Sequence, residues 1–231
     1  MIKIDKLSKQ YGEQVVLRIP ELVIGKGECL GLVGNNGAGK TTLFSLMLDL
    51  IQPSTGQITI NDIPVNESED WKRVTSSFID ESFLIGYLTP EEYFYFIGEL
   101  RGANKATVDA LLATYLDFFN DEILNSKKFL RDFSKGNQKK VGLIASLIGN
   151  PELIIWDEPF ANLDPSTQIR LKNILFQLKA DQSRTILISS HDLSHTVDVS
   201  SRIVALEKGK VVKDIESTPA TLKELEVFFQ V

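Results

Sequence analysis

The sequence is poor in cysteine and histidine, with one cysteine and two histidines among 231 residues. A single cysteine, Cys29, excludes a disulfide within the chain. Its place in the apolar run CLGLVG indicates a small buried hydrophobic residue more than a reactive thiol. Long apolar runs are also missing, since no stretch approaches about eighteen uninterrupted apolar residues, and this predicts a soluble protein.

A secretory leader is not recognisable at the N-terminus. The segment MIKIDKLSKQYG alternates apolar and polar side chains as a strand does, and it lacks the apolar core of a signal peptide. We therefore expect the mature chain to begin there and to stay in the cytosol. The formal net charge of −6 argues against broad electrostatic attraction to nucleic acid, so no nucleic-acid partner is expected.

What the chain does contain is an ordinary globular composition, with 43% hydrophobic and 24% charged residues. Strand and helix patterns alternate in its first and last parts, whereas the middle is predicted to be mostly helical. We predict one α/β domain over residues 1–231, with a core of about 1–82 and 141–231 and an inserted helical lobe of about 83–140. The alternation predicts a mainly parallel sheet with its ligand at the carboxyl ends of the strands, preceded by an N-terminal antiparallel β layer.

Turn and cap residues set the expected elements. The first helix of the lobe has Thr89 as its N-cap, Pro90 in its first turn and Gly102 past its end. Further helices are expected at 42–51, 107–119, 134–150, 167–180, 193–199 and 218–229, and strands at 2–7, 14–19, 28–34, 57–65, 74–80, 152–159, 184–191 and 202–215, the last with a hairpin turn.

Residues 34–42, GNNGAGKTT, fit the pattern G-x-x-x-x-G-K-[ST] between a strand pattern and a helix pattern. Glycines let consecutive N–H groups face one anion, and the helix N-terminus adds partial positive charge. Lys40 is expected to reach the β and γ phosphates, and the Thr41 hydroxyl to ligate Mg²⁺. A glycine-rich turn that binds nothing is the alternative. The residues expected to bind nucleotide here are Gly34, Asn35, Asn36, Gly37, Ala38, Gly39, Lys40, Thr41 and Thr42.

The apolar strand LIIWDE ends in two acids, Asp157 and Glu158. A carboxylate at a strand end beside the phosphate loop suits Mg²⁺, so Asp157 is expected to serve the metal directly or in its second shell. Glu158 points to the opposite side of the strand and is expected to orient or deprotonate the attacking water. Solvated acids at the end of a strand are the alternative interpretation.

His191 ends the next strand pattern, where a neutral imidazole could donate a hydrogen bond to the γ-phosphate. The segment HDLSH also places His191 and His195 four residues apart, as in the zinc motif H-E-x-x-H, but with Asp in place of Glu. We favour the phosphate role for His191 and expect His195 to be a solvated helix residue.

The stretch FSKGNQKK, residues 133–140, resembles the LSGGQ signature that separates the ATP-binding cassettes of ABC transporters from other phosphate-loop ATPases. The phosphate loop, LIIWDEP, the NLD of residues 162–164 and the SSH of residues 189–191 follow in the family's order, so the resemblance spans nearly the whole chain. It implies a phosphate-loop NTPase core, ATP and Mg²⁺ as ligands, and a Tyr11 ring that stacks on adenine.

The resemblance further implies that two cassettes pair head to tail, the second being an identical chain or a close homologue. Each ATP would lie between the phosphate loop of one cassette and Ser134 and Gly136 of the other. ATP hydrolysis would then power a separate transmembrane permease gripped by the helical lobe, which places the chain on the inner face of the cell membrane. The signature and the short lobe resemble exporter cassettes more than importer cassettes.

The sequence departs from the family at two places. Lys135 and Asn137 replace a glycine and a glutamine of the signature. In the loop that joins core and lobe, Asp80 and Glu81 stand where the family usually has one glutamine, and either acid could ligate Mg²⁺ or repel the γ-phosphate. Two other hypotheses stay open, a soluble ABC-type ATPase such as an iron–sulfur assembly factor, and an ATP-binding regulatory module without turnover.

Overall fold

The computed structural model describes residues 1–229, and its strands form two sheets. The smaller sheet is antiparallel, with strand order β2-β1-β4-β5. The larger sheet has the order β10-β9-β3-β8-β7-β6, and its strands are parallel except β10. The strands are β1 (Ile2–Tyr11), β2 (Gln14–Ile24), β3 (Cys29–Val33), β4 (Thr55–Ile60), β5 (Ile63–Pro64), β6 (Thr75–Phe78), β7 (Leu153–Trp156), β8 (Thr185–Ser190), β9 (Arg202–Glu207) and β10 (Lys210–Glu216). Both the antiparallel layer and the mainly parallel sheet are confirmed.

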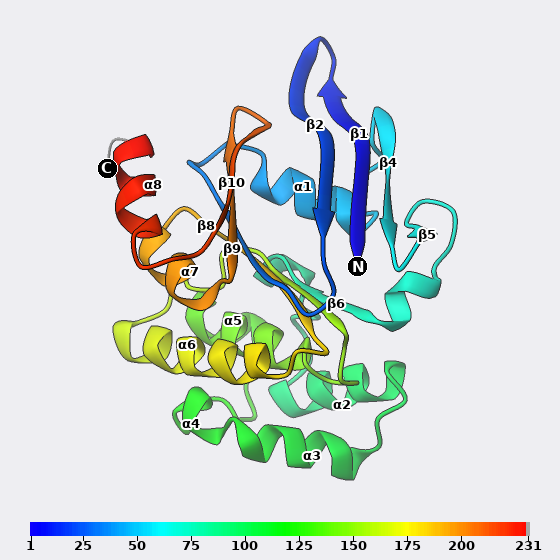
Figure 1. Cartoon of the computed structure of the whole chain (residues 1–231). Helices are drawn as coiled ribbons and strands as arrows, with labels where there is room; N and C mark the ends of the chain where they lie inside the picture. The colour runs from blue at the N-terminus through cyan, green and yellow to red at the C-terminus, as the bar shows by residue number, and fades with distance from the viewer. Residues whose placement is uncertain (230–231) are drawn as a thin grey trace.

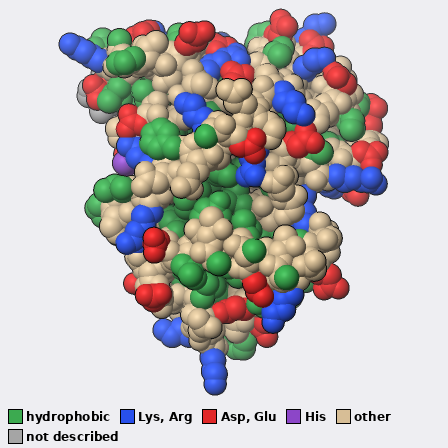
Figure 2. Space-filling view, turned by 60° about the horizontal axis from the view of Figure 1, so that its bottom comes forward, with side chains coloured by type: hydrophobic (Ala, Val, Ile, Leu, Met, Phe, Trp, Pro, Cys, Tyr) green, Lys and Arg blue, Asp and Glu red, His purple; other side chains and the backbone are tan. Residues whose placement is uncertain are grey.

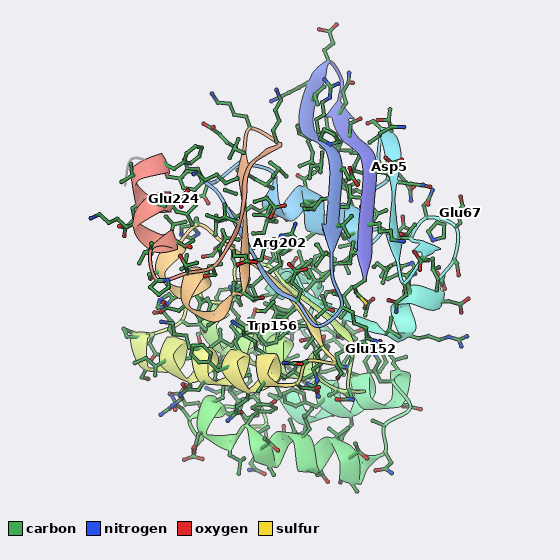
Figure 3. All side chains as sticks on the ribbon, viewed as in Figure 1. Asp5, Glu67, Glu152, Trp156, Arg202 and Glu224 are labelled. Carbon is green, nitrogen blue, oxygen red and sulfur yellow. The ribbon has the colours of Figure 1, made fainter. Side chains whose placement is uncertain are left out.

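Helices cover both faces of the larger sheet. Side chains along a strand alternate between the two faces of its sheet. Along β7, Leu153 and Ile155 pack in a core cluster with α1 and the smaller sheet, and Ile154 and Trp156 pack on the other face in a cluster with α5 and α6. Figure 3 labels Trp156 in this interior. The α-helices are α1 (Lys40–Met47), α2 (Pro90–Leu100), α3 (Lys105–Thr114), α4 (Leu116–Phe119), α5 (Lys135–Ala145), α6 (Pro165–Ala180), α7 (Leu193–Val199) and α8 (Thr221–Phe229), and the 3₁₀ helices are η1 (Asp70–Arg73), η2 (Glu81–Phe83) and η3 (Leu130–Asp132).

The helices α2, α3 and α4 lie together at the end of the molecule opposite the β1–β2 hairpin (Figure 1). Helix α2 begins with the expected capping box, in which Thr89 and Glu92 bond each other's backbone N–H groups. The expected division into core and lobe stays a prediction. Helix α5 begins inside the expected lobe and continues past residue 140 to Ala145. Within residues 1–229, no helix has the length and apolar content that a membrane crossing requires.

Several expected elements are shorter or divided. Helix α1 ends at Met47 and not at residue 51, because Asp49 adopts a left-handed φ of 53°. The expected strand 57–65 is a hairpin of β4 and β5, turned by Asn61 and Asp62 at positive φ. The expected helix 107–119 is broken at Tyr115, and the last helix begins at Thr221 and not at residue 218.

Candidate functional site

Three neighbouring strand ends bring the expected site residues together. The strands β3, β8 and β7 are adjacent and parallel, with Val33 opposite Ser190 and Trp156 opposite Ile188. Their carboxyl ends therefore meet at one edge of the sheet. The phosphate loop follows β3, His191 follows β8, and Asp157 follows β7.

The phosphate loop turns into the N-terminus of α1 without a side-chain cap. Gly39, at φ 107°, occupies the N-cap position, and Gly37 also has a positive φ, of 81°. Such backbone is open to glycine at little cost. Because Gly39 has no side chain to cap the helix, the first N–H groups of α1 are not taken by a side-chain acceptor there. The loop can therefore offer backbone donors to an anion.

The ammonium of Lys40 lies in the floor of this loop, and the residue is only 6% exposed. Its Nζ donates to the carbonyl oxygen of Gly34 at 2.6 Å and to that of Asn35 at 3.5 Å. It also lies 3.3 Å from Oε1 of Glu158. One buried cation thus connects the phosphate loop with the end of β7.

Thr41 and Asp157 present two oxygens to one point. The Thr41 hydroxyl donates to Oδ2 of Asp157 at 2.6 Å, and the Ser189 hydroxyl donates to Oδ1. Burial raises the pKa of Asp157, while the hydrogen bonds from Ser189 and Thr41 act to lower it. A hydroxyl with one carboxylate suits Mg²⁺, which proteins commonly hold through one or two carboxylates together with phosphate oxygens. Residues 1–229 contain no cluster of three or more acidic, histidine or cysteine side chains that could hold a metal ion.

Glu158 reaches two cationic or polar partners from a left-handed backbone of φ 47°. Its Oε1 faces Lys40, and its Oε2 lies 2.9 Å from Nδ1 of His191. The backbone N–H of Glu158 donates to Ser189 Oγ at 2.9 Å. Glu158 is partly exposed and His191 about half exposed, so both can meet a ligand arriving from solvent.

Tyr11 and the signature residues lie on other elements. Tyr11 ends β1 and is 54% exposed, and the ammonium of Lys9 lies over its ring, 4.8 Å from the centroid. Ser134 is the N-cap of α5 and accepts from the N–H of Asn137 at 3.2 Å. A Cβ on Gly136 would lie 2.8 Å from the carbonyl oxygen of Asn162, so α5 packs closely on the loop after β7. Among the described residues, no hydrogen bond joins Ser134 or Gly136 to the phosphate loop of the same chain.

The two acids after β6 differ in their surroundings. Asp80 caps η2 by accepting from the N–H of Ser82 at 2.8 Å, and this hydrogen bonding lowers the pKa of Asp80. Glu81 is buried and lies 3.5 Å from Nζ of Lys139, a residue of α5. Of the two carboxylates, Glu81 is therefore engaged inside the protein and Asp80 remains at its surface.

The structure corrects one expectation and adds residues. His195 is not a solvated helix residue: its ring stacks on Phe160 with centroids 4.9 Å apart, and its Nδ1 is buried. The sequence pattern could not reveal this contact, because Phe160 lies in the loop after β7 and His195 lies in α7. The structure also shows two residues that bond to the backbone of Glu158, Ser189 and Lys139. Both lie within motifs recognised in the sequence, but the motif spacing alone did not predict these contacts.

The chain is similar to proteins of one family. The family model described as ABC transporter matches residues 17–161. An uncharacterized ABC transporter ATP-binding protein of Methanocaldococcus jannaschii is 33% identical, covering 91% of this chain and 76% of that protein. The bacitracin transport ATP-binding protein BcrA of Enterococcus faecalis is 32% identical, covering 93% of this chain and 69% of that protein.

Solved structures give the same result. The ATP-binding subunit of an ABC transporter superposes with a TM-score of 0.84 at 29% identity, covering all of this chain and 93% of the other. A bacterial ABC transporter cassette, solved as a dimer, superposes with a TM-score of 0.82 at 25% identity, covering 94% of this chain and 99% of the other. The expected fold class is thereby confirmed.

Proposed function

The chain belongs to the ABC transporter family as an ATP-binding subunit with ATPase activity, and we propose that it powers a separate membrane permease. The observation that carries the site assignment is the meeting of Lys40, Glu158 and His191 at adjacent strand ends. The direction of transport that we propose, export, rests on the resemblance of FSKGNQKK and the short lobe to exporter cassettes.

In the proposed mechanism, each residue has one role. The loop N–H groups and Lys40 hold the β and γ phosphates, and the adenine stacks on Tyr11. The Glu158 carboxylate accepts a proton from the attacking water or orients it, with His191 beside it as a γ-phosphate contact. Thr41 and Asp157 would hold Mg²⁺, which when bound neutralises charge on the phosphate oxygens.

We further propose that two chains close on each other around the nucleotide. Among the described residues, Ser134 and Gly136 make no hydrogen bond to the phosphate loop of their own chain, which leaves the N-terminus of α5 available to a partner chain. The N-terminus of α5 is a suitable second anion site. The dimeric cassette named above supports this arrangement by analogy.

An apolar groove between β6 and α2 is our proposed contact for the permease. It encloses about 370 Å³, and its lining includes Phe83 and Leu100, which are 62% and 67% exposed. Exposed aromatic and aliphatic side chains that line a groove commonly mark a protein contact. On the face drawn in Figure 2, apolar side chains gather in a hollow bordered by charged ones.

Capture from membranes tests the permease assignment. The wild-type chain should retain a multispan membrane protein encoded beside it, and Phe83→Glu or Leu100→Glu should release that protein. Val227→Glu is the matched control, because Val227 is at least as exposed, at 72%, but belongs to α8. Equal retention by all variants would place the contact elsewhere.

A further inference from the structure

Lys139 is a buried cation that the proposed mechanism leaves without a role. It lies on α5, near the end of the stretch 133–140 that resembles the signature, and its side chain is only 5% exposed. A charge this far from solvent is unfavourable unless it is paired and hydrogen-bonded. Its Nζ donates to the backbone carbonyl of Glu158 at 2.8 Å and lies 3.5 Å from Oε1 of Glu81. The lysine therefore joins three segments: α5, the loop after β6 and the loop after β7.

The hydrogen bond from Lys139 is accepted by Glu158, a residue whose backbone is constrained. Glu158 is a non-glycine residue at φ 47°, a conformation that persists only where its surroundings enforce it. Its N–H donates to Ser189 Oγ at 2.9 Å, and its carbonyl accepts from Lys139 and, at 3.2 Å, from the N–H of Ala161. These bonds hold the peptide groups on either side of the Glu158 Cα. The direction of the Glu158 side chain toward Lys40 depends on that backbone.

Glu81 supplies the negative charge that pairs with Lys139 but forms no close hydrogen bond with it. The Glu81 carboxylate is 7% exposed, and its Oε1 has no hydrogen-bond partner, so its interaction with Lys139 is an ion pair at 3.5 Å. The shorter contact of Nζ goes to the Glu158 carbonyl. The pair thus satisfies the buried charge and leaves a donor for the backbone beside the proposed catalytic base.

We propose that Lys139 is a positioning residue for ATP hydrolysis: its ammonium holds the Glu158 carbonyl and so aims the Glu158 carboxylate. Because Lys139 belongs to α5 and its counter-ion to the loop after β6, a shift of either segment changes the aim of Glu158. The inference rests on the proposed role of Glu158 as base. A purely structural lysine would stabilise the fold and leave the catalytic rate of folded protein unchanged.

Two variants separate positioning from stability. Glu81→Gln removes the counter-ion and keeps the bond from Lys139 to the Glu158 carbonyl. Glu81→Gln with Lys139→Met removes that bond as well, and it leaves no unpaired buried charge that would unfold the protein. The double variant should fold and should bind ATP as the single variant does. The kcat of the double variant should be lower than that of Glu81→Gln by on the order of 10- to 100-fold, as expected when a catalytic group is misplaced, and its KM should be unchanged.

Equal kcat in the single and double variants would overturn the proposal. A second comparison uses the wild-type Glu81. Lys139→Arg keeps a charged donor beside Glu81 and should retain a higher kcat than the double variant Glu81→Gln with Lys139→Met, and equal rates would also count against the proposal. Glu158→Gln, measured alongside, separates the two hypotheses. Full turnover in Glu158→Gln would refute the role of Glu158 itself, whereas loss of turnover there with equal rates in the Lys139 pair would refute only the positioning role.

Discussion

The ammonium nitrogen of Lys40 lies 3.3 Å from Oε1 of Glu158, so the cation of the phosphate loop and the proposed catalytic base form an ion pair. Lys40 is buried and Glu158 is partly buried, which strengthens their interaction relative to a surface pair. The positive charge of Lys40, which is expected to bind the γ-phosphate, is therefore also paired with the Glu158 carboxylate, which is expected to activate water. We therefore expect nucleotide affinity and hydrolysis to be coupled through this pair.

Glu158→Gln should abolish most turnover and should not weaken ATP binding. The amide cannot accept the proton of water, so phosphate release should fall by roughly 10²- to 10⁴-fold. Loss of the negative charge removes the competitor for Lys40 and the repulsion of the γ-phosphate, so ATP affinity should rise. Phosphate release and calorimetry measure the two effects. Undiminished release would remove Glu158 from its role.

Lys40→Ala should weaken nucleotide binding itself. The lysine is the buried cation of the loop, and a charged hydrogen bond contributes about 1.5–3 kcal/mol, or roughly 10- to 100-fold in affinity. Calorimetry with ATP measures the change, and Lys223→Ala, at an exposed position on α8, is the control. Equal affinity in both variants would contradict the assignment of the phosphate site.

Tyr11→Ala should weaken the binding of ATP and the binding of GTP by similar amounts. The exposed ring offers a stacking surface, and stacking contributes about 1–3 kcal/mol with little preference among bases. Tyr11→Phe keeps the ring and should bind both nucleotides nearly as the wild type does. A loss limited to one base, or a loss equally large in Tyr11→Phe, would point to hydrogen-bonded recognition instead.

The phosphate loop and the order of the elements could be predicted from the sequence, because they depend on local signals. Thr89 and Pro90 predicted the start of α2, and the apolar run before Asp157 predicted β7. Contacts between distant segments could not be predicted in the same way. The stacking of His195 on Phe160 depends on tertiary packing that neither residue type nor spacing encodes.

The acids after β6 illustrate the same limit. Asp80 and Glu81 are adjacent and chemically alike, so the sequence left their roles interchangeable. The fold separates them, because Asp80 caps η2 at the surface while Glu81 turns inward to Lys139. The role proposed for Lys139 could not be read from the sequence either, because it depends on the burial of residues 138–145 of α5, which only the fold reveals.

The stability of the protein should fall in alkaline solution through Cys29. Burial raises the pKa of the Cys29 thiol from 9.0 to about 11. Between these values the unfolded thiol loses its proton while the folded thiol keeps it, so the free energy of unfolding decreases as pH rises, by up to about 1.4 kcal/mol per pH unit. Below pH 9 this stabilising contribution is fully present.

Denaturant unfolding of the wild type and Cys29→Ala checks this contribution. The alanine variant lacks the thiol, so the difference in unfolding free energy between the two proteins should shrink or reverse from pH 9 to pH 11. Comparison of the two proteins cancels the titration of lysines and tyrosines. A difference that stays constant over this range would show that the thiol does not titrate differently in the folded protein.

The dependence of the ATPase rate on protein concentration tests the central claim most directly. If Ser134 and Gly136 of one chain complete the site of another, the rate per chain of the isolated protein should rise with concentration toward a plateau. Ser134→Ala should lower that plateau while ATP binding to the single chain stays as in the wild type, because Ser134 makes no bond to its own phosphate loop. A rate per chain that is independent of concentration and unaffected by Ser134→Ala would contradict the account.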